Sequence, residues 1–160
     1  MNQAQLHLAL NHLPVSATLF GCILLLLGLL RSNSILKQVG LTCFVVSALL
    51  TIPVLETGEG AEEIVEHMGL EANIHDYIHE HEEMAEMAQL ISFLLGAFSL
   101  ITLYFQWQKK AFSKWLAIGT FIISLGGVGY LLATAHSGGE IRHTEIREGF
   151  VVPEDKRHDD

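Results

Sequence analysis

The sequence predicts an all-α integral membrane protein, a bundle of four transmembrane helices, and three observations support this fold class. Half of the 160 residues are hydrophobic, and the mean hydropathy is positive. The hydrophobic residues gather in four stretches, each near the roughly 20 residues that a helix needs to cross hydrocarbon. No Asp, Glu, Lys or Arg interrupts any of the four stretches.

The predicted spans are residues 13–30, 39–55, 87–105 and 115–135. No basic residue precedes the first span and no small-residue cleavage pattern follows it, so we expect a retained helix and not a secretory signal. The spans define a transmembrane domain over residues 1–136. Between the second and third spans, residues 59–86 predict a short outer helical cap, with Gly58, Gly60 and Gly69 as breaks. Residues 137–160 predict a polar tail.

The distribution of charge predicts which ends of the helices face the cytoplasm. The connections after the first and third spans carry basic residues and no acidic one, which is typical of cytoplasmic loops: Arg31, Lys37, Lys109, Lys110 and Lys114. The connection between the second and third spans is rich in Glu and has neither Lys nor Arg. We therefore expect this connection, both termini, all 18 acidic residues and all nine histidines on the outer, periplasmic side.

Two histidines near the first span and one before the third are candidate ligands. His7 and His12 precede Pro14, which fixes the backbone at the membrane boundary, and His12, closer to hydrocarbon, is the preferred candidate of the two. On a helix over residues 74–88, His75, His79, Glu82 and Glu86 form a polar stripe, while His81 lies in the middle of the opposite, apolar face. His81 is predicted to point into the bundle, as a ligand or as a hydrogen-bonded core residue.

The fourth span ends in another candidate. Gly126, Gly129 and Ala133 share one helix face, and His136 continues it where the apolar run stops. This strip predicts either close helix packing or room for a flat cofactor held by a nearby histidine. His143, in the tail, is a further candidate.

Carboxylates supply a second set of candidates. The acidic stripe is typical of a solvated helix face. Glu56 and Glu59, at the mouth of the bundle, are candidate hydrogen-bond acceptors for a ligating histidine. A divalent transition metal could instead be held by His12, His81, His136, Glu59 and Glu82, since imidazole and carboxylate suit zinc, copper or iron.

Several longer motifs resemble a family of small bacterial four-helix membrane proteins: LHLALNHLPVSATLFG, ETGEGAEE, HEHEE and AHSGGEIRH. The chain is also distantly similar to the domain-of-unknown-function family 2231, with HPxxxHxP in its first helix and a final GGxLVY. Here Leu8 replaces the first proline, and Arg142 and His143 replace Val-Tyr. Similarity to four-helix b-type cytochromes implies a non-covalent haem b held by histidines from different helices, and a place in the bacterial inner membrane.

The sequence thus predicts a single-haem membrane protein that exchanges electrons with quinol or an outer-side redox protein, or senses redox state, using two of His7, His12, His81, His136 and His143. The alternatives are a divalent metal-binding protein and a structural subunit of a membrane complex. The net charge of −9 argues against a nucleic-acid partner. No catalytic constellation is recognisable, so whether the chain is an enzyme stays open, and an oligomer is compatible with every alternative.

Overall fold

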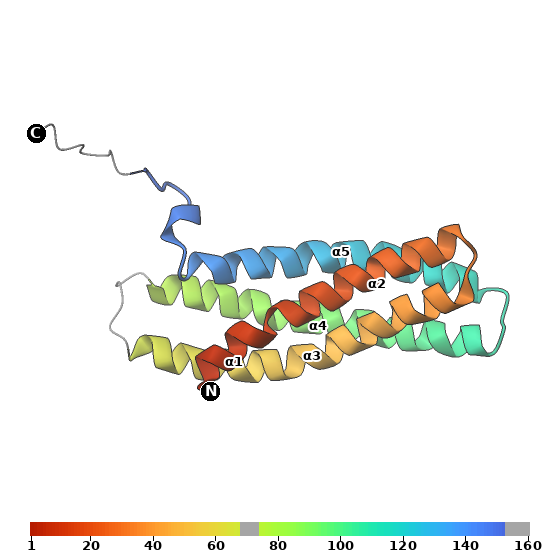
Figure 1. Cartoon of the computed structure of the whole chain (residues 1–160), viewed down its shortest axis with the longest axis horizontal. Helices are drawn as coiled ribbons and strands as arrows, with labels where there is room; N and C mark the ends of the chain where they lie inside the picture. The colour runs from red at the N-terminus through yellow and green to blue at the C-terminus, as the bar shows by residue number, and fades with distance from the viewer. Residues whose placement is uncertain (68–73, 153–160) are drawn as a thin grey trace, which may run out of the picture.

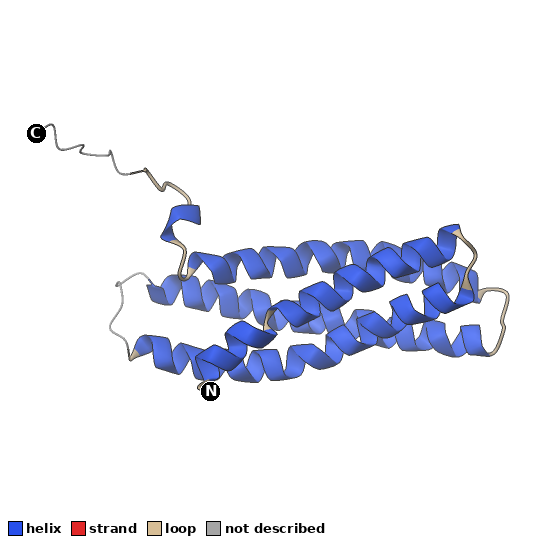
Figure 2. Ribbon diagram, viewed as in Figure 1, coloured by secondary structure: helices blue, strands red, loops and turns tan. Residues whose placement is uncertain are grey.

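The computed structural model describes residues 1–67 and 74–152, and over these residues the chain is helical, with no strand (Figures 1 and 2). The elements are α1 (Gln3–Leu10), α2 (His12–Leu30), α3 (Ser34–Glu66), α4 (Ile74–Trp107), α5 (Ser113–Glu140) and a 3-10 turn, η1 (Thr144–Ile146). The α1–α2 pair, α3, α4 and α5 are each long and apolar enough to cross a membrane. The predicted all-α bundle with four candidate spans is confirmed.

The first span is broken into α1 and α2 at Asn11. Pro14 has no backbone N–H, and its ring crowds the carbonyl of the residue four positions earlier, which is Leu10. α1 ends at Leu10 and α2 begins at His12. The proline therefore permits the change of direction that lets α1 lie beside the second half of α3 (Figure 1).

α3 and α4 are longer than a membrane requires. α3 has 33 residues, so at about 1.5 Å per residue it is about 50 Å long, against roughly 30 Å of hydrocarbon. Gly58 and Gly60 do not interrupt it, in contrast to the prediction, while Gly69 lies outside the described residues. The two glycines instead allow α1 to approach, since a Cβ at Gly60 would lie 2.7 Å from Gln3 Cγ.

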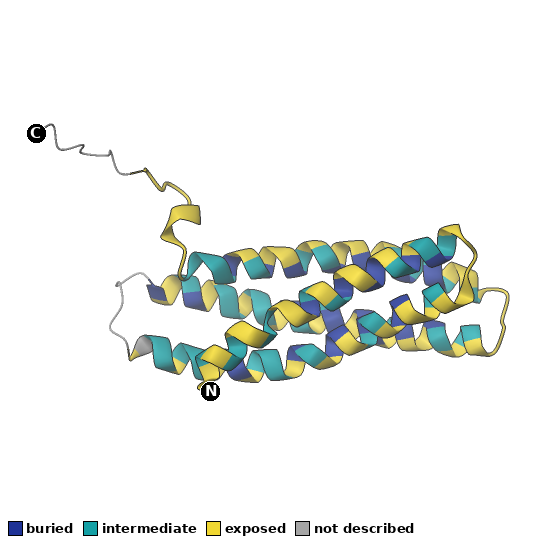
Figure 3. Ribbon diagram, in the orientation of Figure 1, coloured by how far each residue is buried: buried dark blue, intermediate teal, exposed yellow. Residues whose placement is uncertain are grey.

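Buried residues lie on the inner faces of the helices and exposed ones on the outer faces (Figure 3). Many of the exposed residues have large apolar side chains, and many of the buried ones are Ser or Thr. Phe20, Leu94 and Ile122 are 62%, 62% and 63% exposed, as is expected of side chains that face lipid. Inside, the hydroxyls of Thr18 and Ser47 both donate to the carbonyl of Pro14, at 2.9 and 2.8 Å. The Thr18 bond lies within α2, and the Ser47 bond joins α3 to α2.

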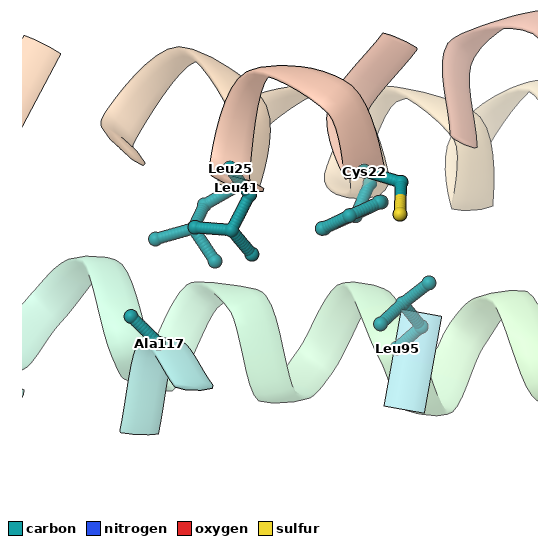
Figure 4. Packing of buried hydrophobic residues seen from close by; sticks show 6 residues of the cluster. Cys22, Leu25, Leu41, Leu95 and Ala117 are labelled. Atoms are coloured by element: carbon teal, nitrogen blue, oxygen red, sulfur yellow. The ribbon is translucent and has the colours of Figure 1, made fainter. Parts of the chain in front are cut away.

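The apolar core is concentrated in the half of the bundle away from the termini, around Cys22, Leu25, Leu41, Leu95 and Ala117 (Figure 4). Glycines bring the helices close together there. A Cβ at Gly40 would lie 2.7 Å from the backbone nitrogen of Leu25 and 2.8 Å from the carbonyl oxygen of Gly21. α2 and α3 are thus in backbone contact at this crossing.

The N-terminus and the segment after α5 lie at the same end of the bundle as the ends of α3 and α4 that flank residues 68–73 (Figure 1). α5 reaches this end too, and it continues through Ser137, Gly138 and Gly139 to Glu140, beyond the predicted start of the tail. The connections α2–α3 and α4–α5 lie at the opposite end. Every histidine that the structure describes therefore belongs to one half of the molecule.

We predict that Gly40→Ala destabilises the bundle by about 1–3 kcal/mol, because the added methyl group meets backbone atoms that cannot rotate away. The matched control is Gly126→Ala, where no atom lies within 4 Å of the new Cβ. The free energy of unfolding in detergent, measured by circular dichroism, should change by less than about 0.5 kcal/mol for the control. Equal changes in the two variants would contradict the packing argument.

Candidate functional site

A cavity of about 410 Å³ lies in the half of the bundle that holds the termini, within the 300–1,000 Å³ typical of ligand sites. Residues of α1, the start of α2, the second half of α3, the first half of α4, the end of α5 and the segment after it line the cavity. Its walls are mostly apolar. Six of the candidate residues from the sequence line this cavity, and two of them are imidazoles held in a defined orientation.

His7, on α1, is half-buried and lies against α3. Its Nδ1 is 3.0 Å from the carbonyl oxygen of Val54. Because a carbonyl oxygen only accepts, Nδ1 carries the hydrogen and donates it. The ring reaches this carbonyl across Gly58, where a Cβ would lie 3.3 Å from His7 Cε1.

His81, on α4, is held by a hydrogen bond to α5, as His7 is held by one to α3. Its Nδ1 is 3.0 Å from Ser137 Oγ. Ser137 donates its single hydroxyl hydrogen to the carbonyl of Thr134, at 2.9 Å, so its oxygen accepts from His81. The ring lies against Gly138, where a Cβ would be only 2.8 Å from His81 Cε1. The predicted inward direction of His81 is confirmed.

The two imidazoles are neighbours across the cavity, with ring centres 6.3 Å apart and ring planes at 78°. Since each Nδ1 donates to the protein, the lone pair of each neutral ring is on Nε2, and no described residue hydrogen-bonds to either Nε2. When two imidazoles bind one metal ion, their ring centres are about 6 Å apart. This distance is the sum of two metal–nitrogen bonds of roughly 2 Å each and the two distances from the ligating nitrogen to the centre of its ring. The donor set and the spacing fit one metal centre between His7 and His81.

Two predicted ligands occupy other positions. His12 lines the cavity but is exposed, whereas His7 is half-buried, so the structure favours His7 over the preferred candidate His12. His7 and His12 are five residues apart, which is about 140° around a helix, and the helix breaks between them at Asn11. Their side chains therefore point in different directions. His136, the candidate at the end of the fourth span, has a side chain that is 63% exposed and does not line the cavity.

His136 points outward because the whole strip that leads to it does. Gly126, Gly129 and Ala133 are exposed, and no atom lies within 4 Å of a Cβ built at either glycine. The buried face of α5 is formed by a different row of mostly small residues: Ala117, Thr120, Ser124, Gly127, Leu131, Thr134 and Ser137. The strip of small residues therefore makes no room for a cofactor within the bundle.

His143 lines the cavity from the segment after α5, and its side chain is 64% exposed. Its Nδ1 is 2.9 Å from Glu145 Oε1. A hydrogen bond from a backbone amide and the His143 side chain lower the pKa of the Glu145 carboxyl. His143 is therefore engaged on the solvent side, and it does not form part of the facing pair.

The predicted carboxylates lie around the histidine pair without bonding to it. Glu59 and Glu82 line the cavity, but the partners of His7 and His81 are a carbonyl and a hydroxyl, so Glu56 and Glu59 do not orient the rings as expected. Glu82 instead lies 3.7 Å from the exposed His79. Among the described residues, no group of three or more His, Cys, Asp or Glu side chains is placed to hold a metal ion.

One polar atom in this region lacks a partner. Asn11 lines the cavity at the break between α1 and α2, and its Oδ1 is buried with no hydrogen-bond partner among the described residues. An unpaired buried amide oxygen costs free energy. A donor from a cavity occupant, or rotation of the amide to present its NH₂ group to an acceptor, would remove this cost.

The fold and the cavity define a class of protein, a bundle of four helices long and apolar enough to cross a membrane, with two neighbouring imidazoles in one half. No family model, curated protein or solved structure matches the chain. The similarity to family 2231 and to b-type cytochromes stays an expectation. The functional argument rests on the site itself.

We predict that Ser137 and His81 are energetically coupled. Ser137→Ala leaves the Nδ1–H of His81 without its acceptor, so a double-mutant cycle with His81→Ala should give a coupling free energy of about 0.5–1.5 kcal/mol. The measurement is chemical or thermal unfolding of the four proteins in detergent. Additivity within about 0.3–0.5 kcal/mol would contradict the hydrogen bond.

Proposed function

We propose that this chain is a b-type haem protein with a single haem ligated by His7 and His81. One observation carries the proposal: the two rings are neighbours in a T-shaped arrangement with 6.3 Å between centres, and both are held through Nδ1, so Nε2 of each ring is the nitrogen that would bind iron. Ligating histidines commonly donate their other ring N–H to an acceptor in this way. Four-helix bundles hold haem between facing helices in the same manner.

The surroundings of the two rings support the same assignment. Gly58 and Gly138, each in contact with one ring, keep side-chain bulk away from the histidines. The walls of the cavity are mostly apolar, which suits the body of a porphyrin, and the buried Asn11 Oδ1 could accept a hydrogen bond from an occupant. When bound, haem b supplies a reversible one-electron iron couple.

The chain's own residues set the properties of such a centre. The carbonyl of Val54 accepts hydrogen bonds from His7 and from Thr57 Oγ1, and the hydroxyl of Ser137 accepts one from His81. Hydrogen bonds of this kind raise the basicity of a ligating nitrogen and fix the orientation of its ring. The predicted roles are electron transfer with quinol or an outer-side redox protein, or redox sensing.

We propose further that the haem half lies on the periplasmic side of a bacterial inner membrane. All the Lys and Arg of the connections lie at the other end, in the loops after α2 and α4. Basic loops stay in the cytoplasm. The parts of α3 and α4 that extend beyond the predicted spans carry the Glu-rich sequence, and acidic side chains are strongly disfavoured in hydrocarbon.

We expect the detergent-purified protein, expressed with ample haem, to show a Soret band and a sharp reduced α band. His7→Ala and His81→Ala should each abolish the bis-imidazole spectrum, because each removes one ligand. The matched control is His136→Ala, which removes an exposed histidine outside the cavity and should leave the spectrum unchanged. The measurement is a reduced-minus-oxidised spectrum with metal analysis of the same sample.

A colourless wild-type protein under these conditions would overturn the haem proposal. Stoichiometric zinc, copper or iron without a Soret band would support the divalent-metal alternative. A colourless and metal-free protein that still assembles into a complex after replacement of His7 and His81 would support a structural subunit.

The orientation has its own test. Alkaline phosphatase fused to the C-terminus should be active, because this enzyme folds only in the oxidising periplasm. Fusion after Lys110, within the α4–α5 connection, should give an inactive enzyme. The reverse pattern of activity would place the histidine half in the cytoplasm.

A further inference from the structure

A second hollow lies between α2 and α3 on the outside of the bundle, and we call it the outer groove. Its volume is about 270 Å³, and its lining residues are Ala17, Gln38, Val39, Thr42, Cys43 and Val46. Four of the six are exposed, so the groove opens away from the bundle. The Thr42 hydroxyl donates to the carbonyl of Gln38 at 2.9 Å, which leaves a mostly apolar surface for an occupant.

The outer groove lies in the half of α3 that begins at the α2–α3 connection, opposite the N-terminus (Figure 1). From Gln38 to Val46 it follows α3 for about 12 Å, at about 1.5 Å per residue. These residues fall in the first half of the predicted span 39–55. In a membrane the groove is therefore at the depth of the acyl chains of one leaflet.

Two basic residues stand at the end of the outer groove. Lys37 immediately precedes Gln38, and Arg31 caps the end of α2. The connection is tight, because the backbone N–H of Asn33 donates to the carbonyl of Gly28 at 2.9 Å. A Cβ at Gly28 would lie 2.7 Å from Lys37 Cγ, so the stem of Lys37 crosses α2 one turn before Arg31. Both cations thus belong to one corner of the bundle.

No acidic side chain neutralises this corner. Asp and Glu are absent from residues 1–55 and from residues 87–139. Arg31 and Lys37 form no ion pair with any residue in the described ranges 1–67 and 74–152. Cations at the boundary of hydrocarbon attract the phosphates of anionic lipids, which lie at the same depth.

We propose that the outer groove and this corner bind one anionic phospholipid, with an acyl chain in the groove and the phosphate at Lys37 and Arg31. Arginine presents a forked pair of N–H donors that matches phosphate oxygens. The long stem of Lys37 lets its ammonium group reach the headgroup while its methylenes stay against the protein. The proposal requires only that the helices cross a membrane, and it does not rest on the haem.

Charge decides between a lipid and the other occupant that an apolar groove accepts, a helix of a second copy. A second copy in the same orientation presents Arg31 and Lys37 at the same depth and no acidic residue near them. It would therefore add like charges to this corner. An anionic phospholipid supplies the apolar chain and the opposite charge together.

The test is native mass spectrometry of the full chain in detergent, titrated with phosphatidylglycerol or with phosphatidylcholine of identical acyl chains. We expect the wild type to bind the first phosphatidylglycerol molecule roughly ten-fold more tightly than the first phosphatidylcholine. Lys37→Gln and Arg31→Gln should each reduce this ratio about three-fold, and the double variant should bring it close to one. The matched control is Lys114→Gln, at the same end of the bundle but on α5, which should keep the ratio.

A second pair of variants tests the acyl-chain part of the site. Ala17→Phe fills the outer groove, so it should weaken the binding of both lipids and leave their ratio unchanged. Ser16→Phe adds a similar bulk at an exposed position of α2 outside the groove and should have no effect. In the wild type, phosphatidylglycerol should also slow the alkylation of Cys43 by a maleimide, since Cys22 is buried and Cys43 lines the groove.

Equal binding of the two lipids by the wild type would overturn the proposal, and so would an unchanged ratio in the double variant. A dimer that Ala17→Phe dissociates, with lipid binding unaffected, would assign the groove to a second copy instead. These measurements use protein without haem. A colourless protein that prefers phosphatidylglycerol would thus retain the lipid site and lose the haem proposal.

Discussion

The distance between helix backbones decides what each half of this bundle contains. In the half away from the termini, Gly21 and Gly40 let α2 and α3 approach until a single methyl group would not fit between them. Lipid offers no hydrophobic driving force for helix association, so such close packing and internal hydroxyl bonds hold the bundle together. In the other half, α1 diverges from the direction of α2 at Asn11, and the space between the helices is a cavity. The proline-dependent break therefore separates a packed half from a binding half.

Much of the fold follows from the sequence because a membrane leaves few alternatives. Hydrocarbon requires every backbone group to be satisfied within the segment, so four charge-free apolar stretches predict four helices with little ambiguity. The ends of the helices were harder to predict. Gly58, Gly60, Gly138 and Gly139 are common signals of a helix end, yet all four are helical here because neighbouring side chains, including His7 and His81, use the space they leave.

The site was only partly predictable, and the reasons differ between residues. The direction of His81 follows from the apolar face around it. The direction of His7 was available from the spacing, because it continues the inward row of Pro14, Thr18, Gly21, Leu25 and Gly28 by steps of three and four residues. Proximity to hydrocarbon, which favoured His12, is a weaker criterion than helix face. In α5, the row of hydroxyl residues from Thr120 to Ser137 marks the buried side, whereas the glycines of the other row face outward.

No sequence pattern could supply the partners of the two rings. Val54 acts through its backbone carbonyl, which every residue has, and Ser137 is one of many small polar residues in the bundle. Their roles depend on the three-dimensional approach of α1 to α3 and of α4 to α5. The equivalence of the two arrangements, a glycine beneath each ring and an acceptor at each Nδ1, becomes visible only when the helices are packed.

This arrangement is costly for a protein whose cavity has no occupant. An apolar cavity forfeits the dispersion contacts that side chains would make, and larger residues at Gly58 or Gly138 would fill part of it. The Asn11 oxygen adds a buried polar atom without a hydrogen-bond partner among the described residues. The haem that we propose would offset these costs, because it would fill the cavity with apolar contacts and bind the two imidazoles.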